Sequence, residues 1–330
     1  SILKHCGSSL DAHLAENEWA RTNGIMTGAD YLKCWIASVF QKPEEPLPYL
    51  FLYNTKQNTG KSLFHEALSL LCTKGIVRAD QALTHDTFNG ELQGAVVCVI
   101  EETDINNTKN KKAYNRIKDW VTSRQIQIRD LYQSPRTVTN TTHWIQCSND
   151  PDNVPIFPGD TRIVMLYVPE LSAEEMVAKR VLIERLKKEA PDFLAEILNL
   201  EIPPCNDRLN IPVIDTPDKE SASYENMDDV NKFITSSCYT VNGSSVLFSK
   251  FYEKFIESVE PAERSSWTKI RVGKCLDKNK YPKGRITGES VTRIGNVSLE
   301  QPDKDYKPEK RYIASGGDKI ELVSLTKAKK

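Results

Sequence analysis

The chain has 330 residues, of which 39% are hydrophobic and 27% are charged, and its formal net charge is −1. This composition and the mean hydropathy of −0.47 are typical of a water-soluble globular protein with room for two or three domains. No apolar run approaches the roughly 18 residues of a membrane-spanning helix, and the N-terminus lacks the layout of a secretion signal. We therefore expect a cytoplasmic protein without a membrane partner.

The eight cysteines are spaced too widely for a CxxC motif, so neither a zinc site nor a disulfide framework is expected. Charge is distributed unevenly along the chain. From Arg264 to Lys330 there are 17 Lys and Arg against 8 Asp and Glu, whereas the rest of the chain has 27 against 37. A basic C-terminal segment on an acidic body indicates a polyanionic partner, although a basic tail kept for solubility has the same composition.

A strand, a loop and a helix are predicted in succession near the N-terminus. Residues 28–40 have the spacing of an amphipathic helix, and three prolines follow in QKPEEPLP. YLFLY (49–53) is a short apolar run that is typical of a buried strand. Helical spacing returns in KSLFHEALSLLC, which begins at Lys61.

The loop between this strand and helix contains NTKQNTGKS, residues 54–62. A phosphate-binding loop is usually spelled with a glycine, four residues, then Gly-Lys-Ser or Gly-Lys-Thr. Gly60, Lys61 and Ser62 fit this spelling, but Thr55 occupies the position of the first glycine. We expect Asn54 to make the left-handed turn instead. In such a loop Lys61 would neutralise phosphate oxygens and the Ser62 hydroxyl would ligate Mg²⁺; a chance GKS is the alternative.

Two further strands end in polar side chains. GAVVCVIEE is so uniformly apolar that it indicates a strand buried on both faces of a parallel sheet, and it ends in Glu101 and Glu102. THWIQCSND is another strand and places Asn149 at its end. Ligands of open α/β sheets bind at the carboxyl ends of the strands, so these side chains are expected around the same phosphates. One glutamate would hold the Mg²⁺ shell and the other would polarise the attacking water.

The remaining segments complete the predicted organisation. QIQIRDLYQSPRTVT is expected to form a hairpin and TRIVMLYVPE a strand, and a charged helix follows. The expected domains are an N-terminal helical region (1–45), a nucleotide-binding core (46–203), a Pro-rich linker (204–224) and a basic domain (225–330). In the basic domain, helices followed by a strand pair are typical of a winged helix and equally of a generic small α+β unit.

Taken together, QNTGKS, VVCVIEE and HWIQCSN resemble the ATPase core of superfamily 3 helicases, and more narrowly the poxvirus and phage primase-helicase branch. The resemblance covers about residues 49–168. It implies an AAA+-like P-loop fold with a parallel central sheet, ATP and Mg²⁺ as cofactors, and a ring, usually a hexamer, that translocates on single-stranded or forked DNA. It further implies a phage, viral or plasmid replication protein in the host cytoplasm, with a primase-polymerase domain upstream in the polypeptide as a further partner.

The resemblance also assigns roles to residues. The catalytic set is Lys61, Glu101, Glu102, Asn149 and Arg162, with Arg162 as the arginine finger that reaches the neighbouring subunit's γ-phosphate. ATP would contact Asn58, Thr59, Gly60, Lys61, Ser62 and Leu63, and Mg²⁺ would contact Ser62 and Glu101. DNA would contact Arg129, Tyr132, Gln133 and Arg136 of the hairpin, and Lys269, Arg271 and Lys274 of the basic domain.

Two other functions fit parts of the sequence. A P-loop phosphotransferase that acts on a small molecule would contain the same loop, but the linker and the basic domain argue against this function. A non-catalytic replication scaffold or loader with a decayed ATP site would explain why the first glycine is missing. ATP turnover and its response to DNA distinguish the three.

Overall fold

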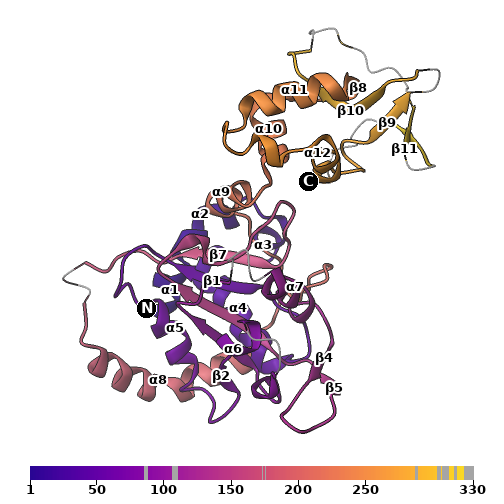
Figure 1. The fold of residues 1–330 in the computed structure, drawn as a ribbon. Coiled ribbons are helices and arrows are strands. Elements are labelled where there is room, and N and C mark those ends of the chain that lie inside the picture. The colour runs from indigo at the N-terminus through magenta and orange to yellow at the C-terminus, as the bar shows by residue number, and fades with distance from the viewer. Residues whose placement is uncertain are drawn as a thin grey trace. The chain divides into compact units, whose positions relative to one another are not determined.

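The structure is a computed structural model that describes residues 1–84, 88–105, 111–172, 174, 176–286, 289–302, 306, 312–315 and 318–322. The chain divides into two compact units, Ser1–Asn226 and Met227–Lys330 (Figure 1). We call them the first and the second unit, and each is described by itself.

The centre of the first unit is a parallel sheet of five strands in the order β2-β3-β6-β1-β7. The strands are β1 (Tyr49–Tyr53), β2 (Ile76–Arg78), β3 (Val97–Glu101), β6 (His143–Ser148) and β7 (Ile163–Tyr167). The expected α/β class with a parallel central sheet is therefore confirmed. Because β3, β6 and β1 are neighbours in this order, the loops that leave their carboxyl ends meet at one edge of the sheet.

Helices cover both faces of this sheet, and the alternation of side chains along each strand divides the core in two. One face packs against α1 (Ile2–Gly7), α4 (Gly28–Gln41), α5 (Lys61–Leu68) and α8 (Lys179–Asn199). The other packs against α6 (Asp80–Thr84), α7 (Lys111–Trp120) and α9 (Pro217–Glu225). In β1, Leu50 and Leu52 face the first cluster, whereas Tyr49, Phe51 and Tyr53 face the second. This two-sided burial explains the continuous apolar run.

The N-terminal helices are fixed to the core by close contacts. α2 (Asp11–Leu14) and α3 (Glu18–Thr22) follow α1, and Thr27 caps α4 in a capping box with Asp30. The backbones of α1 and α4 approach so closely that a Cβ at Gly28 would lie 1.9 Å from the carbonyl oxygen of Gly7. Residues 1–45 are therefore part of the first unit.

The segment expected to be a linker, 204–224, is also part of the first unit. Leu209, Ile211 and Ile214 are buried in the core of the first unit, and α9 begins within the segment. The hydroxyl of Tyr53 donates a hydrogen bond of 2.5 Å to Asp218 of α9. Low periodicity concealed these contacts, because single apolar residues between prolines can fill a core without forming a regular face. The boundary between the units lies at 226/227, close to the expected 224/225.

A two-stranded hairpin of β4 (Gln125–Ile128) and β5 (Arg136–Thr139) projects from the first unit, as the alternating sequence predicted. Strand β2 was missed, since IVR is too short to show a period. Single 3₁₀ turns occur at Ser8–Leu10, Gly90–Leu92, Pro151–Asn153 and Arg264–Ser266.

In its described residues, the second unit has three α-helices and a five-stranded sheet. Its elements are α10 (Asp229–Ser237), β8 (Tyr239–Leu247), α11 (Phe248–Ser258), α12 (Lys269–Cys275), β9 (Lys283–Ile286), β10 (Thr292–Ser298), β11 (Tyr312–Ser315) and β12 (Asp318–Glu321). The strands pair antiparallel in the order β12-β11-β9-β10-β8. Phe233, Phe251, Phe255 and Trp267 form edge-to-face pairs in the core of this unit. The helices expected here are present, but β8 lies between α10 and α11, and a five-stranded sheet takes the place of the expected strand pair.

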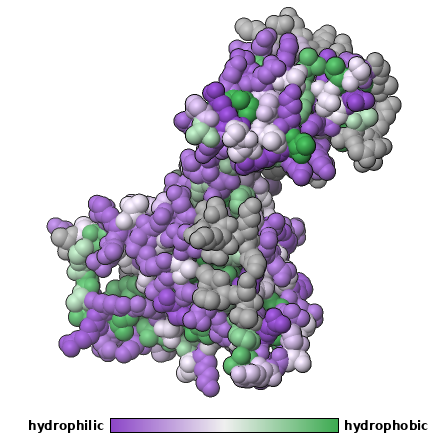
Figure 2. Space-filling view, viewed as in Figure 1, coloured by the Kyte–Doolittle hydropathy of each residue, from purple (hydrophilic) through white to green (hydrophobic). Residues whose placement is uncertain are grey.

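Most of the visible surface of both units is hydrophilic, with hydrophobic residues scattered among polar ones (Figure 2). In the described part of the chain, no helix has the length and apolar character needed to cross a membrane.

Candidate nucleotide-binding site

The loop between β1 and α5 turns through two residues in the left-handed conformation, Asn58 with φ of 59° and Gly60 with φ of 90°. Asn54 does not have a positive φ, so the expectation that it makes the left-handed turn was wrong. Instead its side chain accepts a hydrogen bond from the N–H of Lys56 (2.8 Å) and donates one to the carbonyl of Val168 (2.8 Å). Such an Asx turn bends the chain at the end of β1 without a glycine, which accounts for Thr55.

Lys61 is the first residue of α5, and its side chain folds back across the loop. Its Nζ donates to the carbonyl oxygens of Asn54 (3.3 Å) and Lys56 (3.0 Å) and to the hydroxyl of Thr59 (3.2 Å). Burial lowers the pKa of Lys61, and the charge of Glu102 opposes this effect. The ammonium group is thus held at the centre of the loop.

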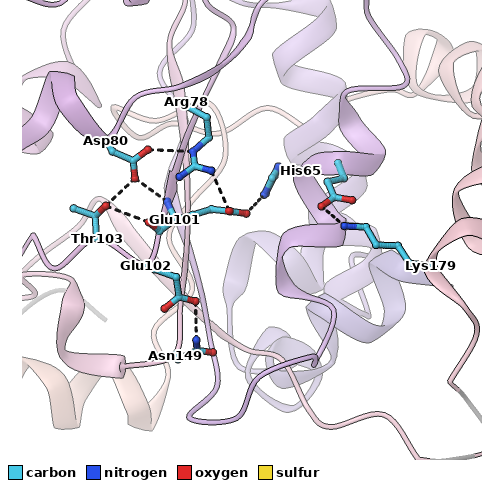
Figure 3. A network of polar contacts seen from close by, with 9 residues as sticks. His65, Arg78, Asp80, Glu101, Glu102, Thr103, Asn149 and Lys179 are labelled. Atoms are coloured by element: carbon cyan, nitrogen blue, oxygen red, sulfur yellow. Dashed lines mark hydrogen bonds and ion pairs between the residues drawn. The ribbon is translucent and has the colours of Figure 1, made fainter.

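Asn149 connects this lysine to Glu102. Its Oδ1 accepts from Lys61 Nζ at 2.9 Å. Its Nδ2 donates to Glu102 Oε1 at 2.7 Å (Figure 3). Glu102 has φ of 53°, a left-handed conformation that ends β3 and turns its carboxylate toward Asn149. The fold therefore brings together Lys61 from the start of α5 and Glu102 and Asn149 from the ends of β3 and β6.

The adjacent Glu101 points the other way, toward α5. His65 Nε2 lies 2.5 Å from its Oε1, and Arg78 donates to its Oε2 at 3.1 Å (Figure 3). Burial raises the pKa of Glu101, but hydrogen bonds from His65 and Ser62 and the charges of His65 and Arg78 outweigh it, so the pKa is lowered. The carboxylate is held ionised beside the Ser62 hydroxyl.

A second layer of polar contacts orients Glu101. Asp80 accepts from the backbone N–H of Glu101 (3.0 Å), from the Thr103 hydroxyl (2.7 Å) and from Arg78 Nε (3.1 Å). Burial raises the pKa of Asp80, and its bonds to Thr103, Glu101 and Arg78 more than compensate. Arg78 therefore bridges two carboxylates at the end of β2 and β3.

The loop offers donors for an anion and oxygens for a cation. Among the described residues, the backbone N–H groups of Thr59, Gly60 and Lys61 have no protein acceptor. They surround the start of α5, where the helix dipole favours negative charge. Ser62 and Glu101 supply the hydroxyl and carboxylate oxygens that Mg²⁺ prefers. The residues present thus fit a nucleoside triphosphate with Mg²⁺.

Comparison with known proteins concerns the fold. Residues 52–162 match a family of unknown function, DUF5906, and no curated protein matches the chain. The fold has solved relatives. The apo structure of the NrS-1 C-terminal region (305–718) matches with a TM-score of 0.56 and 15% identity, over 88% of this chain and 76% of that chain. The A form of this apo structure matches with a TM-score of 0.57 and 16% identity, over 90% of this chain and 75% of that chain. A further A-form apo structure of this region matches with a TM-score of 0.53 and 16% identity, over 81% of this chain and 63% of that chain.

Arg162 does not lie with the other predicted catalytic residues. It precedes β7, at the amino edge of the sheet, and its Nε donates to the carbonyl of Lys118 (3.3 Å). The loop after β1 lies at the opposite, carboxyl edge of this parallel sheet, so the fold does not bring Arg162 to the other predicted site residues of its own chain.

The four predicted hairpin residues divide into braced and free side chains. Arg136 donates to Asp130 Oδ2 (2.8 Å) and Gln133 Oε1 (2.7 Å) and also contacts Gln93. Tyr132, with φ of 58°, has 96% of its surface exposed. Arg129 is exposed too, and within the described ranges its hydrogen bonds are those of its backbone to Asn89. Of these four predicted residues, Tyr132 and Arg129 thus have exposed side chains that no other described residue bonds.

Lys269, Arg271 and Lys274 all lie on α12 in the second unit. The residues that sequence reasoning missed are His65, Arg78, Asp80 and His5, whose Nε2 lies 2.8 Å from the carbonyl of Thr59. Of these, His65 carried a usable signal, because a residue three positions after Ser62 on a helix shares its face. The others come from segments distant in sequence.

Proposed function

We propose that the protein is an ATP-dependent DNA translocase of the superfamily 3 helicase type and acts in replication of a phage, viral or plasmid genome. The observation that carries the proposal is the chain of hydrogen bonds from Lys61 through Asn149 to Glu102 at the end of a glycine-containing loop. In this order, the lysine would bind the γ-phosphate, the amide would sense it and the carboxylate would polarise the attacking water.

Each residue has a separate task in the proposed hydrolysis. The N–H groups of the loop and Lys61 would bind and orient the phosphates of ATP. Glu102 would accept a hydrogen bond from the attacking water and orient it in line with the γ-phosphate. Asn149 lies between Glu102 and Lys61, so it would register whether the γ-phosphate is present.

Ser62 and Glu101 would hold Mg²⁺, which when bound neutralises charge on the phosphate oxygens. His65 and Arg78 each contact one oxygen of Glu101, so they are proposed as positioning residues that fix its carboxylate. Arg78 also forms an ion pair with Asp80. Arg78 would therefore keep one ion pair if Glu101 turned toward Mg²⁺.

Assembly and the DNA partner follow from the two exposed features. The placement of Arg162 at the edge opposite the loop supports action in trans, in a ring of subunits. The projecting hairpin with an exposed Tyr132 supports contact with single-stranded DNA inside that ring. We further propose that the second unit is winged-helix-like, since its three helices are followed by the antiparallel pair β9–β10.

The test is ATP hydrolysis by the full chain with and without a single-stranded oligonucleotide. Wild-type protein should hydrolyse ATP, and the oligonucleotide should stimulate the rate. Lys61→Ala should abolish hydrolysis, while Lys56→Ala, an exposed loop lysine paired with Glu170 at 2.7 Å, should retain it. Normal hydrolysis by Lys61→Ala would refute the site. ATP binding without turnover in the wild type would favour the scaffold instead.

A further inference from the structure

Two lysines of the second unit are held by aromatic rings of α11. Lys283 Nζ, at the start of β9, lies 3.9 Å from the centroid of Phe248. Lys269 Nζ, at the start of α12, lies 5.4 Å from the centroid of Tyr252. Phe248 and Tyr252 are four residues apart on α11, so their side chains are neighbours on one face of that helix. The two ammonium groups therefore follow α11, about one helical turn apart.

Neither lysine has a carboxylate partner among the residues that the structure describes. A cation held by the face of a ring keeps its full charge, whereas one held by a carboxylate is neutralised. Lys283 is only partly exposed, and burial lowers its pKa. A desolvated, un-neutralised ammonium group has a strong preference for an anion.

Gly273 makes room for Lys283. It lies in the middle of α12, where glycine is a poor helix former. A Cβ at this position would lie 2.2 Å from Lys283 Nζ and 3.3 Å from its Cδ and Cε. The side chain of Lys283 therefore crosses α12 over the space that the missing Cβ leaves. Alanine would favour the helix and displace the lysine.

We propose that Lys269 and Lys283 form a phosphate-binding pair that docks the second unit on the backbone of duplex DNA. The rings of this face favour a duplex over a single strand. Phe248 and Trp267 are buried, and Phe248, Tyr252 and Trp267 each carry a cation, with Arg271 lying 3.8 Å from the centroid of Trp267. Single-strand binders instead leave rings open for bases to stack on.

The proposal deepens the proposed function, on which it rests for the choice of DNA as the polyanion. Binding of a labelled random-sequence DNA duplex to the full chain, without nucleotide, tests it. Lys283→Gln and Gly273→Ala should each weaken binding about 3- to 10-fold near 0.1 M salt and flatten the slope of log K against log salt by about 1. Lys254→Gln is the matched control, because this α11 lysine is already neutralised by Glu257 at 2.8 Å.

Gly273→Ala is the sharper variant, since it leaves every charge in place and should not lower the melting temperature of the second unit. Wild-type affinity and slope in both variants would overturn the proposal. An equal loss on a single strand of the same length would overturn the choice of duplex. The binding assay contains no nucleotide, so a failure of the ATPase assignment, tested by Lys61→Ala, is separable from a failure here.

Discussion

His65 Nε2 and Glu101 Oε1 are 2.5 Å apart, a contact between the helix that follows the phosphate loop and the end of the central strand β3. The side chains are largely buried, with 12% and 23% of their surfaces exposed. Ser62 and His65 belong to the same helix. The contact of His65 with Glu101 therefore fixes the two proposed Mg²⁺ ligands, Ser62 and Glu101, relative to each other.

Loss of this contact should weaken Mg²⁺-dependent hydrolysis without unfolding the protein. We expect His65→Ala to lower ATPase activity about 10- to 100-fold and to raise the Mg²⁺ concentration needed for half-maximal rate, as outer-shell substitutions at metal sites do. Lys179→Gln is the control, because it breaks an exposed ion pair with Glu66 on the same helix. Such pairs contribute at most about 1 kcal/mol. An unchanged Mg²⁺ dependence in His65→Ala would contradict a positioning role.

The aromatic ring of Tyr132, at the tip of the hairpin, should bind DNA. Tyr132→Ala is expected to weaken binding of a single-stranded oligonucleotide by about 1–3 kcal/mol, the typical value of one base–aromatic stack. Tyr132→Phe should retain the affinity, since the face of the ring is unchanged. Fluorescence anisotropy measures both, and equal affinities for wild type and Tyr132→Ala would exclude stacking at this position.

Arg162 should act only on a neighbouring subunit. Lys61→Ala and Arg162→Ala are each expected to be inactive alone. Mixing them should restore part of the ATPase activity, because some interfaces then combine an intact Lys61 with an intact Arg162. The rate after mixing and re-equilibration is the measurement. If mixing restores nothing although both variants assemble, Arg162 does not complete its neighbour's site.

Acid should destabilise the first unit through a buried histidine. His143, 3% exposed at the start of β6, has its pKa lowered by burial from 6.5 to about 4. The folded state thus disfavours the charged form. Its contribution to stability is complete above pH 6.5 and is lost as the pH falls from 6.5 toward 4, by roughly 3 kcal/mol in total. Urea unfolding of wild type and His143→Leu should show a shallower pH dependence in the variant over this window.

The strand ends were predictable and their connections were not. Glu101 and Glu102 follow the apolar run VVCVI, and Asn149 follows HWIQCS, which the sequence also indicated as a strand. The bond between Asn149 and Glu102 joins residues 47 positions apart, and it depends on β3 and β6 being neighbours in the sheet. A single sequence carries no signal for that order. The contact of Arg78 with Glu101 could not be predicted for the same reason, because it depends on β2 lying beside β3.

The second unit shows the limit of periodicity in another way. Strand β8 has the sequence YTVNGSSVL, whose polar residues and glycine are typical of a loop. It forms a strand because β10 pairs with it along most of its length. Tertiary pairing overrides a weak local preference here.

The packing of α9 against β1 determines where the first unit can be cut. A chain ended at residue 203, the expected end of the nucleotide-binding core, would lose Asp218 and leave Tyr53 without its acceptor one residue before the loop. It would also uncover the apolar sites that Leu209, Ile211 and Ile214 fill. The smallest piece of the first unit that folds by itself should therefore extend to Asn226, and a chimaera that replaces the second unit should keep every residue up to that point.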